Sequence, residues 1–268
     1  IIKILMSKEK QKILEKKYNF KSDYIEDFKV FRNEIIKKEI IPYQVEFQAP
    51  PRGKKICWLE CPYCYGLSAD NNGERLSKER GLEILKQIIG GGVKKIIFAG
   101  YATDPLNCDY IGELLDLTIS NKAIFGFNTK ALKISDTFFN ALKNNKIPDS
   151  SYISLSVDAG SNETYNLIHD VKAKKVKIYD QVLKNAKKLG EIKKENYFDL
   201  SAAYLVNINS AKVNDYENFI NDFMGAGCNV LRFSFPQPPK DIKTEKGVVP
   251  TQEEIDFYIS DLNKLKKK

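Results

Sequence analysis

Short apolar runs alternate with helical patterns along most of the chain after residue 42. Runs of about four to eight residues that are rich in β-branched and aromatic side chains favour strands. They predict strands at 44–47, 95–99, 123–127, 152–157, 199–206 and 230–235. Apolar residues at helical spacing predict a helix after each strand, at 77–89, 110–119, 135–143, 179–189, 213–224 and 252–266. Glycine and asparagine residues mark the joins.

Six strand-then-helix units in sequence indicate an α/β protein with parallel strands and right-handed crossovers. Periodicity alone leaves open whether the strands form an open doubly wound sheet or a barrel. Before them, residues 8–18 and 22–38 have the apolar spacing of two helices. We therefore expect an N-terminal helical extension at 1–42, followed by an α/β domain at 43–268.

Composition and charge narrow the class of protein only a little. The 268 residues are 43% hydrophobic, so a large core is available. The net charge of +8 could suit an acidic partner such as RNA. The lysines are dispersed, however, and nucleic acid is not an expected partner. We expect a cytoplasmic protein without membrane contact, because no apolar run is long enough to span a membrane and residues 1–6 do not resemble a signal peptide.

Three of the five cysteines, Cys57, Cys61 and Cys64, lie within one short loop after the first predicted strand. Such a cluster indicates metal or iron–sulfur ligation rather than a disulfide framework. A structural zinc site takes four ligands, and the only histidine, His169, is distant in sequence. A [4Fe-4S] cluster normally takes four thiolates, so three would leave one iron open to another ligand.

The loop resembles the signature of the radical S-adenosylmethionine (SAM) superfamily, a C-x3-C-x2-C motif with an aromatic residue before the last cysteine. Tyr63 occupies that aromatic position. The resemblance extends from about residue 44 to 235 and implies a partial (β/α)6 TIM-like barrel. It also implies that the three cysteines ligate a [4Fe-4S] cluster, that SAM binds the open iron, and that Tyr63 contacts this cofactor.

The segment after the second strand is similar to the Gly-Gly-Glu segment of the same family, which holds the methionine ammonium of SAM. The resemblance implies that Gly100, Tyr101, Thr103 and Asp104 contact SAM. A glycine permits close backbone approach, and a carboxylate complements a cation. Tyr101 nevertheless replaces the second glycine, and an ordinary turn remains the alternative interpretation.

Polar side chains also follow the third and fourth strands. Alternation along the fourth strand predicts that Ser154, Ser156 and Asp158 share one face, and the family has a Ser-x-Asp that contacts SAM at this place. The segment that begins at Asn128, at the end of the third strand, resembles a Thr-Asn-Gly-like turn that the family often carries near its active centre. Among the lysines that follow Asp158, we expect Lys175 to pair with the methionine carboxylate.

Four other residues are candidates with open interpretations. Alternation places Arg232 with Ser234 on one face of the sixth strand, where a buried guanidinium would need an anionic partner. Arg232 either binds substrate or SAM, or pairs with a neighbouring acid. Cys108 is a candidate hydrogen-atom donor, whereas Cys228 and His169 are expected to be structural.

The resemblance implies a mechanism in which the reduced cluster cleaves SAM and the resulting 5′-deoxyadenosyl radical takes a hydrogen atom from a substrate. An electron donor such as flavodoxin or ferredoxin would be a partner. We expect a small biosynthetic substrate, such as a sugar, nucleotide or amino-acid derivative. The alternatives are a peptide or protein substrate, or a non-catalytic iron–sulfur or zinc-binding protein.

Overall fold

The computed structural model describes residues 41–48, 57, 59, 61–64, 76–100, 103–171, 176–207, 210, 215–236 and 250–265. The helices predicted at 8–18 and 22–38 lie outside these residues, and so do two predicted cofactor contacts, Tyr101 and Lys175. No helix in the described part is long and apolar enough to cross a membrane.

A single sheet of six parallel strands forms the centre of the molecule. The strands are β1 (Gln44–Phe47), β2 (Lys95–Phe98), β3 (Ile124–Thr129), β4 (Tyr152–Ser156), β5 (Asp199–Leu205) and β6 (Val230–Ser234). Their spatial order is the order in which they occur along the chain. In a doubly wound sheet the chain adds strands first on one side of the starting strand and then on the other, so the spatial order differs from the order along the chain. The sequential order seen here confirms the predicted partial (β/α)6 barrel.

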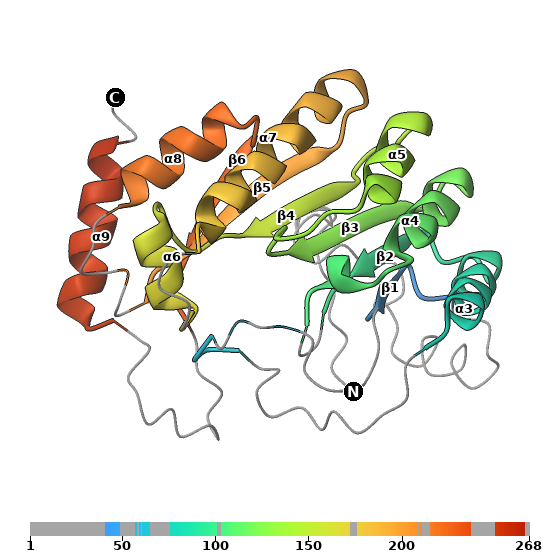
Figure 1. Cartoon of the computed structure of the whole chain (residues 1–268), viewed down its shortest axis with the longest axis horizontal. Helices are drawn as coiled ribbons and strands as arrows, with labels where there is room; N and C mark the ends of the chain where they lie inside the picture. The colour runs from blue at the N-terminus through green and yellow to red at the C-terminus, as the bar shows by residue number, and fades with distance from the viewer. Residues whose placement is uncertain are drawn as a thin grey trace, which may run out of the picture.

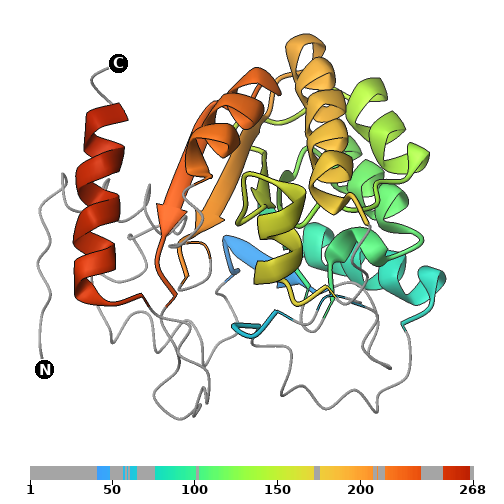
Figure 2. The same cartoon turned by 60° about the vertical axis from the view of Figure 1, so that its left-hand side comes forward.

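Helices cover one face of this sheet. They are α3 (Lys78–Gly90), α4 (Ile111–Ser120), α5 (Asp136–Asn144), α7 (Ile178–Glu195) and α8 (Tyr216–Gly225). Figure 1 shows them side by side over the strands, because right-handed crossovers that always advance in one direction place every helix on the same side. The helix α9 (Gln252–Leu265) stands beyond β6 at the end of the sheet (Figure 2).

The predicted strands agree with the observed ones to within two residues at each end. Two short elements were not predicted: the 3₁₀ helix η3 (Pro105–Asn107) and the helix α6 (Asn162–Ile168). α6 has too few turns to show a periodic apolar pattern. Its start is nevertheless encoded, since the Ser161 hydroxyl accepts a hydrogen bond from the backbone N–H of Thr164 as an N-cap.

The two faces of the sheet differ in chemistry. Residues paired across parallel strands point to the same face, and alternate residues point to opposite faces. The helix-covered face is apolar: Phe98 and Phe127 stack with ring centroids 4.7 Å apart, and Phe127 meets Phe138 of α5 edge-on at 5.0 Å. The opposite face is largely polar. It carries Glu46, Lys95, Asn128, Ser154, Ser156, Ser201, Arg232 and Ser234.

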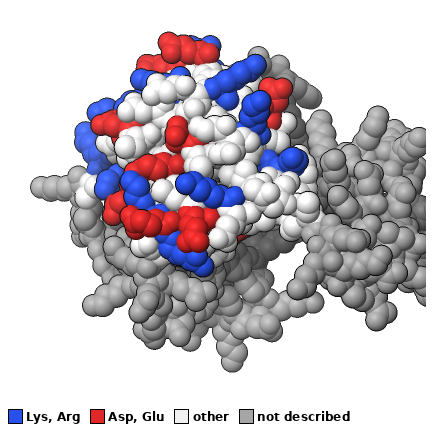
Figure 3. Space-filling view, turned by 90° about the vertical axis from the view of Figure 1, so that its right-hand side faces the viewer, with Lys and Arg blue, Asp and Glu red and all other residues white. Residues whose placement is uncertain are grey.

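Charges of both signs are mixed over the side of the molecule on which α3, α4 and α5 lie (Figure 3). Lysine and arginine alternate there with aspartate and glutamate, and some of these charges form exposed ion pairs. Lys78 and Glu113, for example, link α3 to α4 at 2.6 Å. On this side the basic residues form no continuous patch, as the dispersed lysines of the sequence predicted.

Candidate active site

The cysteine loop between β1 and α3 lies against the ends of the central strands. Cys61 is buried, whereas Cys57 and Cys64 are partly exposed, and none of the three is part of a disulfide. The backbone N–H of Cys64 donates to the carbonyl of Cys61 at 3.0 Å, which folds the loop into a tight turn. Burial raises the pKa of the Cys61 thiol to about 11, against the influence of nearby Lys130, and Cys64 and Cys57 raise it further. Cys61 therefore lies within electrostatic reach of both other cysteines.

These residues fit an iron–sulfur cluster better than a single ion. Within the described residues, no three histidine, cysteine or acidic side chains gather closely enough to hold one metal ion. Each thiolate of a [4Fe-4S] cluster binds a different iron, so its ligands stand farther apart than those around one ion. The three donors that the loop itself supplies are all sulfur, which iron–sulfur clusters prefer.

His169 adjoins this loop from the C-cap of α6. The imidazole is completely buried, with Nδ1 3.1 Å from Cys61 Sγ and 3.0 Å from the Tyr63 hydroxyl oxygen. On the other side of the ring, Nε2 lies 3.3 Å from the carbonyl oxygen of Val157. Burial, followed by the positive charge of Lys130, lowers the pKa of His169 to about 3, so the imidazole is neutral.

Asp158 joins the loop to three strands. Its carboxylate accepts hydrogen bonds from the Lys130 ammonium at 2.7 Å, the Tyr63 hydroxyl at 3.1 Å and the backbone N–H of Leu205 at 3.0 Å. Burial alone would raise the pKa of Asp158, but the Lys130 ammonium and the hydrogen bond from Leu205 outweigh it and hold the pKa below the usual range. In the same way, Asp158 keeps the pKa of the buried Lys130 above its usual value, although burial opposes this.

Asp158 does not follow the alternation predicted for it. Ser154 and Ser156 share the polar face, but β4 ends at Ser156 and Asp158 has a φ of +63°. This left-handed conformation turns the carboxylate toward Lys130 and Tyr63. Aspartate tolerates such a conformation better than most residues.

Asp104 connects the loop after β2 to the end of β3. Its carboxylate accepts hydrogen bonds from the Thr129 hydroxyl at 2.7 Å and from the backbone N–H groups of Leu106 and Lys130 at 2.9 and 2.5 Å. Gly100 is needed for the same loop, because a Cβ there would lie 1.9 Å from the carbonyl oxygen of Thr103. The geometry gives Asp104 a part in the loop structure, and its contact with SAM stays a prediction.

The other predicted residues lie in different surroundings. Asn128 is exposed on the polar face of β3, next to the buried Ser154 in register. Arg232 shares that face with Ser234, as alternation predicted, but it is exposed and makes no ion pair within the described part of the chain. Pairing with a neighbouring acid is thus not seen among the described residues, and a role for Arg232 in binding substrate or SAM stays a prediction.

The two remaining cysteines are both buried. Burial raises the pKa of Cys108 to about 11, and its thiol interacts with Tyr110. Burial also raises the pKa of Cys228 to about 12, in keeping with the expected packing role. A hydrogen-donor function for Cys108 stays a prediction.

Sequence reasoning did not assign Lys130 or Tyr165 to the surroundings of the cysteine loop, and it expected His169 to be only structural. Tyr165 is completely buried, and its hydroxyl has no hydrogen-bond partner among the described residues. Its ring centroid is 4.2 Å from that of His169, one helical turn away. The single histidine of the chain, four residues after a tyrosine, is the signal that could have drawn attention to this pair.

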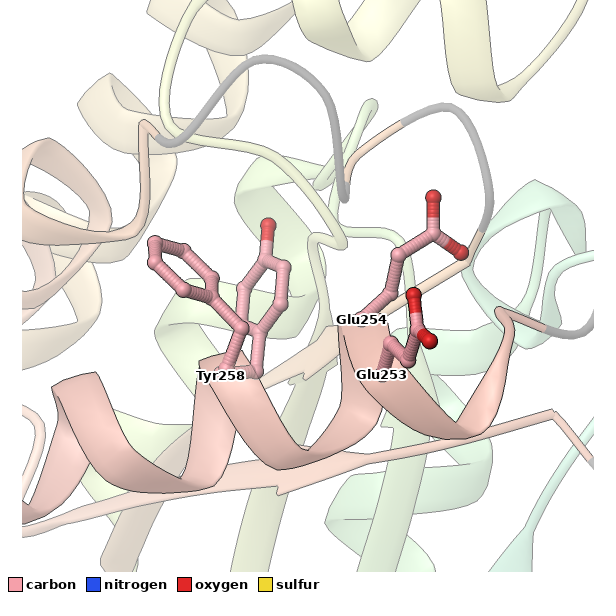
Figure 4. Close-up of a pocket in the computed structure, with 4 residues that line it drawn as sticks. Glu253, Glu254 and Tyr258 are labelled. Carbon is pink, nitrogen blue, oxygen red and sulfur yellow. The ribbon is translucent and has the colours of Figure 1, made fainter.

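A separate pocket lies on α9, away from the predicted site residues. Figure 4 shows Glu253 and Glu254 at the start of this helix and Tyr258 one turn later. The Tyr258 hydroxyl donates to the carbonyl of Ser210 at 2.7 Å, and this bond links α9 to the segment that follows β5. This pocket contains none of the residues that the sequence pointed to.

The fold and the cysteine loop together define a class of protein. The family model of the radical SAM superfamily matches residues 54–234, which is more than half of the chain. The chain belongs to the radical SAM superfamily. A search of curated proteins gives no significant match.

Solved structures of radical SAM enzymes have a similar fold. SuiB from Streptococcus suis, bound to S-adenosylmethionine, has a TM-score of 0.61 at 14% identity, over 87% of this chain and 51% of that one. SuiB bound to its precursor peptide SuiA has a TM-score of 0.60 at 14% identity, over 97% and 50%. A radical SAM methyltransferase from Sphaerobacter thermophilus has a TM-score of 0.51 at 12% identity, over 82% and 62%. The chain thus spans about half the length of SuiB.

Proposed function

We propose that this chain binds a [4Fe-4S] cluster through Cys57, Cys61 and Cys64, cleaves SAM reductively, and abstracts a hydrogen atom from a peptide substrate. The observation that carries the proposal is the three-cysteine loop, which lies against the buried group of His169 and Asp158 at the strand ends. When bound, the cluster and SAM together supply the electron transfer and the radical chemistry. The protein's own side chains bind, orient and exclude water.

The contacts of the side chains near the loop suggest a role for each of them in the proposed reaction. Asp158 and Lys130 form a buried pair that fixes the ends of β3 and β4 relative to the loop. Tyr63 donates to Asp158 and so holds the last turn of the cysteine motif in place. Ser154 and Ser156 lie on the polar face of β4, shortly before Asp158 in the chain, and their hydroxyl groups suit a ribose or a substrate amide.

A peptide substrate is favoured over a small molecule by the extent of the polar face, which crosses all six strands of the sheet. Its exposed side chains run from Glu46 on β1 through Asn128 on β3 to Arg232 on β6. Such a surface can hold an extended chain. SuiB, which has a similar fold, was solved with a precursor peptide. A small biosynthetic substrate, our expectation from the sequence, is the second candidate.

The test of the proposed chemistry begins with anaerobic reconstitution of the protein with iron and sulfide. After addition of dithionite and SAM, we expect 5′-deoxyadenosine, detected by liquid chromatography with mass spectrometry. Cys61→Ala is expected to abolish both bound iron and product, because one cluster ligand is lost. Cys228→Ala is the matched control and should retain both, since Cys228 is buried outside the loop. An intact cluster without SAM cleavage would contradict the proposal.

The substrate class is tested in parallel reactions. One receives a mixture of synthetic peptides, and the other a mixture of nucleosides, sugars and amino acids. We expect only the peptide mixture to raise the yield of 5′-deoxyadenosine and to contain a product of altered mass. Stimulation by the small molecules alone would exclude the peptide and favour the second candidate.

A further inference from the structure

The ring of His169 connects the cysteine loop to a buried ammonium group. Its Nδ1 lies 3.1 Å from Cys61 Sγ. Its Nε2 lies 3.5 Å from Lys130 Nζ and 3.3 Å from the carbonyl oxygen of Val157. Lys130 is held in this position by Asp158 at 2.7 Å. The imidazole is thus placed between a cluster ligand and an ion pair.

The state of Cys61 decides which ring nitrogen carries the hydrogen. A Cys61 thiol can donate to Nδ1, and the hydrogen on Nε2 then points to Val157. A metal-bound cysteine is a thiolate and can only accept. The matching neutral tautomer carries its hydrogen on Nδ1, which donates to the sulfur, while Nε2 accepts from the Lys130 ammonium. Both nitrogens already have the partners that this second arrangement needs.

We propose that His169 is a positioning residue for the cluster, whose Nδ1–H donates a hydrogen bond to the Cys61 thiolate and raises the reduction potential. The inference rests on the proposed function, because it requires the cluster. Reduction adds negative charge to the cluster and its ligands. A hydrogen bond to a ligand sulfur therefore stabilises the reduced state more than the oxidised one.

Packing holds the ring at the angle that this bond requires. Tyr165, one turn earlier on α6, meets the imidazole with an interplanar angle of 60° and a centroid separation of 4.2 Å. Tyr63 lies on another side of the ring, at 6.2 Å. With His169 completely buried, Nδ1 cannot turn to solvent. The Tyr63 hydroxyl donates to Asp158, so it does not compete as a donor to Nδ1. Its oxygen and the Cys61 sulfur can both accept from Nδ1–H, and the negative charge of the thiolate makes the sulfur the stronger acceptor.

A single histidine allows a direct spectroscopic test. Protein labelled with ¹⁵N-histidine, and purified without a polyhistidine tag, contains label only at His169. After reduction of the reconstituted cluster, we expect pulsed EPR to detect ¹⁵N hyperfine coupling that is absent from unlabelled protein. A reduced cluster without ¹⁵N coupling would overturn the inference.

Variants test the effect on the reduction potential. The amide nitrogen of asparagine can occupy the place of Nδ1, whereas that of glutamine reaches the place of Nε2. We expect His169→Asn to keep the wild-type midpoint. His169→Gln and His169→Leu should shift it to more negative values, with about a tenfold lower ratio of reduced to oxidised cluster at a fixed potential, or about 59 mV for one electron. Redox titration followed by EPR measures these midpoints.

The outcomes separate this inference from the proposed function. Equal midpoints in the wild type and all three variants would overturn the role of His169 and leave the cluster assignment intact. If His169→Leu takes up no iron, two other measurements decide whether His169 acts on the cluster. They are the difference in midpoint between His169→Asn and His169→Gln, and the ¹⁵N coupling in the labelled wild type. A wild-type protein that binds no cluster would instead refute the proposed function.

Discussion

At the scale of single residues, the pair of Lys130 and Asp158 accounts for much of the order around the cysteine loop. The two side chains are only 17% and 6% exposed, so each charge depends on the other. Removing one partner of a buried pair leaves the other charged and desolvated, which costs about 3–5 kcal/mol. The pair is therefore a sensitive point of the fold as well as of the site.

Asp158→Asn is expected to lower the free energy of unfolding of the cluster-free protein by about 3–5 kcal/mol at neutral pH. The pKa of Asp158 is lower in the folded protein than in the unfolded chain. Its carboxylate therefore stabilises the fold above the ordinary aspartate pKa of about 3.9, and this contribution is lost as the pH falls through the folded-state pKa. In urea unfolding, the difference in free energy of unfolding between the wild type and Asp158→Asn should be constant above about pH 5 and should shrink below about pH 4. A penalty that grows toward acid pH would contradict this.

The site could be predicted from the sequence where a residue type has one main use. Three closely spaced cysteines indicate metal or cluster ligation on chemical grounds alone, and in the structure Cys61 lies within electrostatic reach of Cys57 and Cys64. Lys130 and His169 could not be found in this way. Lysine is abundant in this chain and histidine is often structural, so their roles appear only when the fold brings them to within 3.5 Å of each other.

At the scale of elements, α6 shows how a short helix can matter more than its length suggests. It carries Tyr165, and His169 is its C-cap, so its position sets the contact with Cys61. Helices of about two turns are marginal by themselves, and capping contributes a large part of their stability. Strands were easier to predict, because runs of apolar residues between turn residues recur six times, whereas α6 offers only its N-cap as a signal.

Ser161→Ala is expected to lower the free energy of unfolding by about 1 kcal/mol, because the first turn of α6 loses the acceptor for the N–H of Thr164. Ser161→Asn keeps a capping oxygen and serves as the matched control. Chemical denaturation of the cluster-free protein measures both. Equal losses in the two variants would show that Ser161 acts through something other than its cap.

At the scale of the whole molecule, the sheet is protected unevenly. The strands β2 to β5 each pair on both sides, whereas β1 and β6 are at the edges of the sheet. β6 is also less buried on its helix-covered side, since Leu231 and Phe233 are partly exposed, while Phe127 of β3 and Leu155 of β4 are completely buried. Local opening of a sheet starts where burial and pairing are weakest.

Hydrogen–deuterium exchange is therefore expected to be slowest in β3 and β4 and faster in β1 and β6. Mass spectrometry of peptic fragments measures this, with the exposed turn at Asp149 and Ser150 as an internal reference for fast exchange. Equal protection of β6 and β4 would contradict the expectation. It would show that another part of the chain or a partner covers the free edge of β6.

The division of the sheet into an apolar and a polar face also bears on how such a protein can change during evolution. In each strand, one set of alternate residues packs under the helices and the other set lies on the polar face. Substitutions at Asn128, Ser156 or Arg232 can therefore alter what is bound without disturbing the core. A one-residue insertion within a strand would exchange the two sets and bury hydroxyl and charged groups under the helices. New specificities are therefore accessible by point substitution on the polar face, whereas changes of length are tolerated only in the connecting loops.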